Sequence, residues 1–347
     1  MNSWDRNWKT AAKNIFEALR IIKGDRLTIL YNPLPAGKEY LVNTLTKLAQ
    51  QEEMPTKSIA LTLDEDFKTD ALETELIPFL EGTNKNQRKF FFTAAKNHFG
   101  PARRAVHKLV SVDPQKFHGY TISLPTDDAD IITALAGTSP NWLWSRGEEL
   151  SKTLSKATAI RITTKKGTDV SFNWDAKRRK YLISAGFPHT HEDHWDNLGG
   201  EVFTAPLHQT VNGKLVIDGA TANIGLVDGT IVVDITNGKG KINRTESTAS
   251  EKMLKEFEAD LTIYPCACIV GEFGIGTTPN LKLRGELLND EKVEGTIHLA
   301  FGDSYASDGS GGENDCDAHS DCMILEPTVD MTIDGKIARL MEAGIFL

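Results

Sequence analysis

The chain has 347 residues, an apolar content of 40% and a formal net charge of −9. This length is enough for two domains of ordinary size, each with its own core. The acidic balance argues against binding to nucleic acid through a basic patch, and the lack of any run of about 18 apolar residues argues against a transmembrane helix.

The first 156 residues alternate between helix and strand patterns. Charged residues interrupt the apolar positions of residues 1–22, which predicts an amphipathic helix and not a signal peptide, so a cytoplasmic location without a membrane partner is expected. Further along, we expect strands at Leu27–Tyr31, Ser58–Leu63, Lys89–Thr93 and Phe117–Leu124, with a helix at Lys38–Gln51. This alternation predicts a mostly parallel sheet flanked by helices, a Rossmann-like α/β domain over residues 1–156. No GxGxxG motif follows any of these strands, so a dinucleotide site is not supported.

Strand patterns dominate residues 157–347. Two strands are expected around a KKGTD turn in Ile160–Phe172, and several short strands around Asp-Gly and Asn-Gly turns in Lys214–Ile242. One helix is expected near Ser247–Ala259, and Asp303–Asp315 has the composition of a flexible loop. The second domain is therefore predicted to be a strand-rich α+β domain with antiparallel sheets.

Four short motifs in this second domain, three of them with neighbouring glycines, carry acids or imidazoles. They supply Glu201, Glu272, His298, His319 and Asp321. These side chains are good ligands for a divalent cation, and on a strand the two residues of the HxD motif point to the same face. Taken singly, a histidine such as His298 is more often a core residue than a metal ligand. An acid such as Glu201 or Glu272 is more often an exposed residue at the start of a strand. Taken together, five N and O ligands exceed the needs of one ion, which predicts two divalent ions about 3.5–4 Å apart.

The four cysteines are Cys266, Cys268, Cys316 and Cys322. None of their spacings is that of a CxxC zinc knuckle, and four cysteines in a chain of this length do not make a disulfide scaffold. Buried free thiols are the expectation; soft metal ligands or a redox pair near His319 are the functional alternative.

The order of these motifs resembles that of the aminopeptidase T family, the thermophile-type dinuclear metallo-aminopeptidases. The similarity includes a GEVFTAP segment, a GELGIG-type segment followed by NPN, a GTVHLAFG-type segment and a final HxD. In this chain they stand at Gly200–Pro206, Gly271–Asn280, Gly295–Gly302 and His319–Asp321, and a GTDVSF segment at Gly167–Phe172 also matches. The first 150 residues share only the general α/β pattern.

The resemblance implies a homodimeric two-domain peptidase that acts on small peptide or amide substrates with two divalent ions. The ions would be Zn, Co, Mn or Mg, and Fe is compatible with the same ligands. The family's metal ligands fall on the five residues named above, and its tyrosine falls on Tyr305. Glu201 or Glu272 would then accept the proton of a metal-activated water, and Tyr305 would donate to the oxyanion.

The chain departs from the family in two places. Ser320 stands inside the HxD motif, where the family usually has an aromatic or bulky residue, and the proline of an NLPGGE segment is missing. Just before Glu201 lies FPHTHEDHWD, with His189, His191 and His194. This segment is either a polar surface loop, or it adds a wall to the substrate pocket or an extra metal contact.

Two other functions compete with hydrolysis. Ring-cleaving Fe(II) dioxygenases that act on dihydroxypyridines look like distant relatives and keep the terminal HxD. They have histidine in place of Glu272 and lack a counterpart of His298, so these two residues favour a hydrolase. A non-catalytic binding protein on the same scaffold is the third reading, and the retention of all five ligands argues against it.

Overall fold

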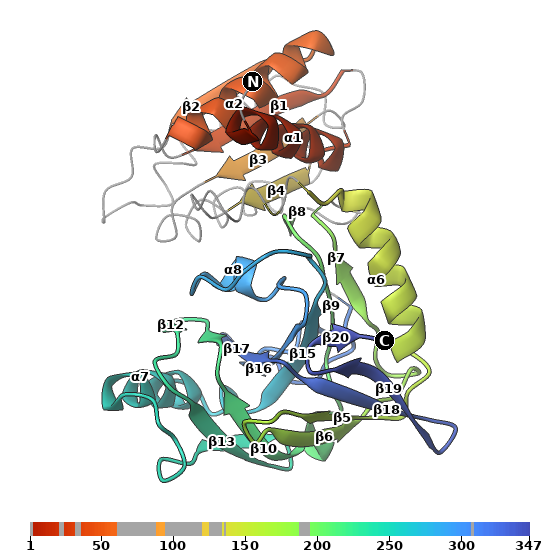
Figure 1. Ribbon diagram of the computed structural model, residues 1–347, viewed down its shortest axis with the longest axis vertical. Helices are drawn as coiled ribbons and strands as arrows, with labels where there is room; N and C mark the ends of the chain where they lie inside the picture. The colour runs from red at the N-terminus through yellow and green to blue at the C-terminus, as the bar shows by residue number, and fades with distance from the viewer. Residues whose placement is uncertain are drawn as a thin grey trace. The chain divides into compact units, whose positions relative to one another are not determined.

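The structure is a computed structural model, and it describes residues 3–20, 24–31, 36–60, 88–93, 120–124, 134, 137–186, 195–306 and 309–347 (Figure 1). The chain forms two compact units. Unit 1 comprises Met1–Leu143 and Ser184–Gly199, and unit 2 comprises Trp144–Ile183 and Gly200–Leu347. The division at residue 156 stays a prediction of the domain boundary; the compact units divide at Leu143 and return a later segment to unit 1.

Unit 1 contains a sheet whose described strands are all parallel, in the order β2-β1-β3-β4-β8. The described elements are α1 (Ser3–Ala18), β1 (Arg26–Tyr31), α2 (Ala36–Gln51), β2 (Thr56–Ala60), β3 (Arg88–Thr93), β4 (Tyr120–Leu124) and β8 (Trp195–Asn197). Helices α1 and α2 contact each other, and α2 also contacts β1 and β2. The parallel pairing agrees with the alternating pattern of the sequence. A Rossmann-like arrangement stays a prediction, because residues 61–87 and 94–119 lie outside the described residues.

Unit 2 is built from two sheets whose named strands pair antiparallel, as the turn-rich pattern predicts. The first has the order β14-β13-β10-β6-β5-β18-β19-β20. Its strands are β5 (Ala159–Thr163), β6 (Asp169–Asn173), β10 (Asn212–Ile217), β13 (Ile231–Thr236), β14 (Lys239–Ile242), β18 (Thr328–Ile333), β19 (Lys336–Glu342) and β20 (Ile345–Phe346).

The second sheet of unit 2, the site sheet, has the order β12-β11-β17-β16-β15-β9-β7. Its strands are β7 (Leu182–Ser184), β9 (Glu201–Thr204), β11 (Ala220–Thr221), β12 (Gly225–Leu226), β15 (Val270–Gly276), β16 (Thr296–Gly302) and β17 (His319–Leu325). The helical segments are α6 (Pro140–Leu154), which begins in unit 1, η1 (His208–Thr210), α7 (Glu251–Thr262) and α8 (Leu287–Asp290).

A continuous apolar core lies between the two sheets and α7. Phe172 of the first sheet packs on Phe273 of the site sheet, with ring centroids 5.3 Å apart. Phe257 of α7 packs on Phe301 of the site sheet at 6.3 Å. Because successive side chains of a strand point to opposite faces, a strand that buries apolar residues on one face can present polar residues on the other.

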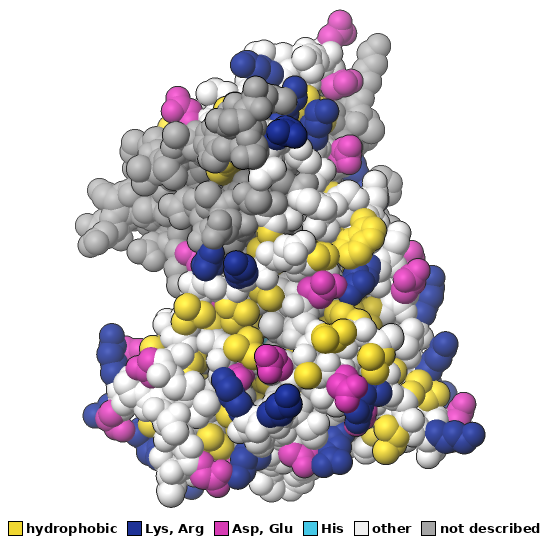
Figure 2. Space-filling view, in the orientation of Figure 1, with side chains coloured by type: hydrophobic (Ala, Val, Ile, Leu, Met, Phe, Trp, Pro, Cys, Tyr) yellow, Lys and Arg dark blue, Asp and Glu magenta, His cyan; other side chains and the backbone are white. Residues whose placement is uncertain are grey.

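Basic and acidic side chains are interspersed over the described part of the face in Figure 2. Exposed pairs such as Arg161–Asp169 and Arg244–Glu251 belong to this mixed surface. Such exposed pairs contribute little to folding because water and salt screen them, so the stability of unit 2 depends mainly on its core. Among the described residues, no helix is long and apolar enough to cross a membrane.

Candidate metal centre

Four neighbouring strands of the site sheet bring the five predicted ligands to one face. Glu201 lies on β9, Glu272 on β15, His298 on β16, and His319 and Asp321 on β17. The residues that alternate with them point to the core between the sheets, and include Val202, Phe273, Ile275, Ile297, Leu299 and Cys322. The period of two along each strand therefore separates the apolar core from the candidate site.

Each candidate ligand lies opposite a glycine or alanine of the neighbouring strand. The pairs are Glu201 with Gly276, Glu272 and Asp321 with Ala300, His298 with Gly274, and His319 with Gly302. A Cβ atom on Gly274 would lie 2.0 Å from Nε2 of His298. The glycines of the GEFGIG motif thus make space for side chains that converge over the middle of the sheet.

The ligand atoms converge within contact distance. His298 Nε2 lies 2.9 Å from Glu272 Oε1, 3.7 Å from Glu201 Oε2 and 3.9 Å from Asp321 Oδ1. His319 Nε2 lies 3.4 Å from both Glu272 Oε2 and Asp321 Oδ1. The ligand atoms form two groups, each with its atoms within 4.8 Å of one another: Glu201, Glu272 and His298, and Glu272, His319 and Asp321. Glu272 belongs to both groups.

Burial gives these groups unusual acidities. Burial raises the pKa of both Glu201 and Glu272. For His298, burial lowers the pKa, but the hydrogen bond to Glu272 and the nearby carboxylates outweigh it and raise the pKa to about 9. Burial is outweighed in the same way at His319, where Asp321 and Glu272 raise the pKa to about 10. Without a metal, the two imidazoles therefore hold protons that balance part of the carboxylate charge, and a divalent cation would replace them.

Two features of the donor set fit a metal ion. Oε2 of Glu201 is buried among the ligand atoms and has no hydrogen-bond partner. A buried carboxylate oxygen without a partner is costly unless a cation is bound there. Nδ1 of His319 contacts the backbone oxygen of Asp303 at 3.0 Å, which turns Nε2 toward the other ligands, as is usual for metal-binding histidines.

A buried lysine at the edge of the cluster was missed by the sequence analysis. Nζ of Lys292 donates to Glu201 Oε1 at 2.5 Å and to Glu291 Oε1 at 2.7 Å. Burial would lower the pKa of this lysine, but Glu201 and Glu291 outweigh burial and raise it. In the sequence, Glu291 and Lys292 stand in an NDEKVEG segment that has the composition of a solvated turn. The signal that hinted at a role in the site was that DEKVEG directly precedes the TIHLAFG strand and belongs, with it, to a stretch that resembles the family's equivalent stretch.

Tyr305 lies beside the ligands. Its ring centroid is 4.7 Å from that of His319 and 5.8 Å from that of Phe203, which follows Glu201 by two residues on β9. Burial, together with Glu272 and Asp321, raises the pKa of Tyr305 well above its usual value. The hydroxyl therefore keeps its proton and can act as a hydrogen-bond donor. His189, His191 and His194 lie outside the described residues.

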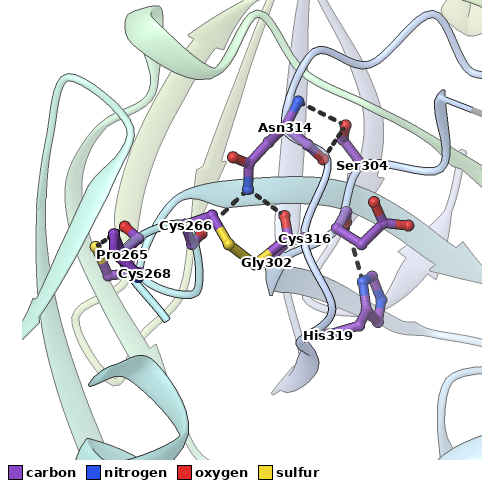
Figure 3. Close-up of a disulfide and its surroundings, with 9 residues drawn as sticks. Pro265, Cys266, Cys268, Gly302, Ser304, Asn314, Cys316 and His319 are labelled. Atoms are coloured by element: carbon purple, nitrogen blue, oxygen red, sulfur yellow. Dashed lines mark hydrogen bonds between the residues drawn. A yellow bond between two sulfur atoms is a disulfide. The ribbon is translucent and has the colours of Figure 1, made fainter. Parts of the chain in front are cut away.

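A disulfide between Cys266 and Cys316 anchors the segment before His319 (Figure 3). The expectation of free thiols is therefore wrong for these two residues, whereas Cys268 and Cys322 are free. The two partners are 50 residues apart, so the local spacing of the cysteines did not reveal the pairing.

Asn314 reinforces this anchor. Its Nδ2 donates to the backbone oxygens of Cys266 at 3.1 Å and Gly302 at 2.6 Å (Figure 3). Ser304 Oγ donates to the backbone oxygen of Asn314 at 2.8 Å and accepts from its N–H at 2.9 Å. In its described residues, the predicted flexible loop Asp303–Asp315 is thus a hydrogen-bonded segment that supports Tyr305.

The mixed α/β scaffold and its buried carboxylate–imidazole cluster define a candidate metalloenzyme. A family model described as thermophilic metalloprotease (M29) matches residues 142–346. The chain belongs to this metallopeptidase family, in agreement with the resemblance of its motifs. No curated protein matches the sequence.

Two solved structures share the fold over nearly the whole chain. Wild-type AmpT from Thermus thermophilus has a TM-score of 0.70 and 20% identity, and the match covers 99% of this chain and 100% of AmpT. The 2,5-dihydroxypyridine dioxygenase from Pseudomonas putida KT2440 has a TM-score of 0.65 and 14% identity, and the match covers 97% and 96% of the two chains. At these identities, the similarity establishes the fold alone.

A first prediction concerns the space beside His298. Gly274→Ala should push the imidazole out of the cluster and weaken divalent-ion binding by about 10–100-fold, the usual effect of disturbing the support of a metal ligand. Gly240→Ala is the matched control, because its Cβ would meet the Phe301 ring at 2.4 Å, within the core. Equal ion affinity in the two variants, measured by calorimetric titration, would contradict a specific role of Gly274.

A second prediction concerns the disulfide. Replacing both Cys266 and Cys316 with serine should lower the free energy of unfolding of unit 2 by about 2–5 kcal/mol, because the unfolded chain loses a cross-link. Cys268→Ser, two residues away, controls for loss of a thiol. Denaturant unfolding followed by tryptophan fluorescence measures both, and an equal midpoint in the two variants would refute the prediction.

Proposed function

We propose that the protein is a metal-dependent aminopeptidase-like hydrolase that removes N-terminal amino acids from peptides or small amide substrates. The observation that carries this proposal is the buried cluster of two overlapping ligand groups that share Glu272. Membership of the M29 metallopeptidase family supports it. Two ligand groups with a common carboxylate suit two divalent ions close together.

In this proposal, Glu201, Glu272 and His298 would hold one ion, and Glu272, His319 and Asp321 would hold the other. The ions are Zn, Co, Mn or Mg, with Fe compatible with the ligands. When bound, they supply Lewis-acid polarisation of the scissile carbonyl and an acidified water. Glu272 would contribute to both ion sites, because its two carboxylate oxygens face different histidines, Oε1 toward His298 and Oε2 toward His319.

Side chains around the ions would transfer the proton and stabilise the oxyanion. A carboxylate, Glu201 or Glu272, accepts the proton of the attacking water. The Tyr305 hydroxyl, kept protonated by its buried and acidic surroundings, donates to the tetrahedral oxyanion. Phe203, whose ring contacts that of Tyr305, gives an apolar border to the site.

The wider assignment belongs to the same proposal. Each chain would have a Rossmann-like domain over residues 1–156 and a metal-binding catalytic domain over residues 157–347. Two such chains would form a homodimer in the cytoplasm. The histidine-rich segment Phe187–Asp196 would shape the choice of substrate.

The fold shared with the dihydroxypyridine dioxygenase keeps one alternative open. His298, His319 and Asp321 make up a two-histidine, one-carboxylate set of the kind that non-haem Fe(II) oxygenases use. The five-ligand set favours hydrolysis, because Glu272 contacts both imidazoles and adds a carboxylate that such an iron site does not need.

A test of the proposed function combines metal analysis with activity. Purified protein at saturation should hold two divalent ions per chain and release amino acids from aminoacyl amides. Glu272→Gln should abolish hydrolysis, because it removes the charge shared by both ion sites, while leaving the circular dichroism spectrum unchanged. One ion or fewer per chain would contradict the two-ion form. Iron-dependent oxygen uptake with a dihydroxypyridine, without hydrolysis, would favour the dioxygenase.

Tyr305→Phe separates transition-state stabilisation from substrate binding. Loss of the hydroxyl should lower kcat by about 10²–10³-fold with KM nearly unchanged, as expected for an oxyanion donor. Phe203→Leu is the control for the aromatic contact, since it alters packing against the same ring without removing a donor. A change confined to KM in Tyr305→Phe would mean that the tyrosine only borders the substrate.

A further inference from the structure

We propose that Lys292 is a positioning residue of the metal centre, which holds Glu201 so that one carboxylate oxygen is presented to the metal. This inference rests on the proposed function and assigns a role to a residue outside the predicted ligand set. It is carried by the contacts of Lys292, the burial of its surroundings and the anchoring of its backbone.

The two oxygens of Glu201 have different surroundings. Oε1 accepts from Nζ of Lys292 at 2.5 Å, whereas Oε2 is buried without a hydrogen-bond partner and lies 3.7 Å from Nε2 of His298. A charge-assisted hydrogen bond fixes the carboxylate strongly. Lys292 thus leaves Oε2 as the oxygen free for a cation, and Glu201 becomes a ligand through one atom.

A second carboxylate, that of Glu291, also binds Lys292. Its ammonium also donates to Glu291 Oε1 at 2.7 Å, so it lies between two carboxylates. The side chain of Lys292 is 1% exposed and that of Glu201 is 8% exposed. An ammonium buried to this degree is tolerated only when it is paired and hydrogen-bonded. Glu291, Lys292 and Glu201 therefore form a buried, hydrogen-bonded ion triad and not a chance surface contact.

The backbone around Lys292 is anchored to the strand that carries Glu272. The N–H of Thr278 donates to the Lys292 oxygen at 2.9 Å, directly after β15. Gly276, which pairs with Glu201, permits this approach, because a Cβ there would lie 2.2 Å from the oxygen of Val293. The lysine is thus attached to the same strands as the ligand that it orients.

Charge and orientation predict opposite effects of removing the lysine. A positive charge near a cation site repels the cation, so a lysine that acted by charge alone would weaken metal binding, and its removal would strengthen it. A lysine that orients a ligand strengthens metal binding, and its loss costs about 10–100-fold in affinity. Oε2 of Glu201 has no hydrogen-bond partner and is directed at the ligand cluster. This favours a lysine that orients Glu201 over a lysine that acts by charge alone.

The test is a double-mutant cycle in which Co²⁺ binding is measured for each variant. Visible absorption monitors the binding, because the Co²⁺ bands report the number and geometry of the ligands. Lys292→Met should weaken Co²⁺ binding by about 10–100-fold and change the absorption bands. Glu201→Gln should also weaken binding. If Lys292 acts through Glu201, the double variant should bind Co²⁺ as Glu201→Gln does, to within about threefold.

Two further variants supply a control and a second test of the coupling. Lys166→Met is the control, because it removes a lysine paired with Asp218 elsewhere in unit 2 and should leave Co²⁺ binding unchanged. Glu291→Gln keeps both the ammonium and a hydrogen-bond acceptor. It should weaken Co²⁺ binding less than Lys292→Met does, and this loss should vanish in the Glu201→Gln background. This variant tests the same coupling if Lys292→Met does not fold.

The outcomes separate the inference from the proposed function. Unchanged or tighter Co²⁺ binding by folded Lys292→Met, or a loss that persists in the Glu201→Gln background, would overturn the positioning role while the proposed function stands. A wild-type protein that binds no divalent ion would overturn both.

Discussion

The site depends on one constraint: several carboxylates and imidazoles must be buried together on one face of a sheet whose other face lies in the core. The register between β9, β15, β16 and β17 meets this constraint by placing a small residue opposite each candidate ligand. A slip of one residue would turn Phe273 and Ile275 toward the ligands and Glu272 into the core. Packing across the sandwich, as in the contact of Phe172 with Phe273, therefore fixes the site as well as the fold.

The local sequence carried much of this information. In GEFGIG and TIHLAFG, acids, imidazoles and small residues alternate with large apolar ones, which separates the two faces of each strand before any pairing is known. HxD places His319 and Asp321 on one face for the same reason. These patterns, with the order of the motifs, predicted the five residues that converge. The alternation in the N-terminal half likewise predicted parallel pairing, which depends on helical connections between strands.

The features that were missed depend on contacts between distant segments. Lys292 lies in a charged stretch, and a buried lysine looks like an exposed one until its partner Glu201, 91 residues away, is known. The disulfide joins segments 50 residues apart, and its cysteines have no spacing that reveals the pair. The return of the chain to unit 1 through β8 involves three residues, Trp195–Asn197, too few for a strand period to be recognised.

The lysine also makes the two glutamates of the proposed centre unequal. Glu201 has one oxygen bound to an ammonium and one free, whereas Glu272 directs one oxygen at each histidine. Glu272 would therefore suit a place in both ligand groups, with one oxygen toward each histidine, whereas Glu201 would offer one free oxygen to a single ion. Burial raises the pKa of Glu201, and the Lys292 ammonium opposes this rise because it stabilises the ionised carboxylate. In the proposed reaction, Glu201 is thus best suited to hold an ion through Oε2. The buried ion pair beside it then gives the centre its asymmetry.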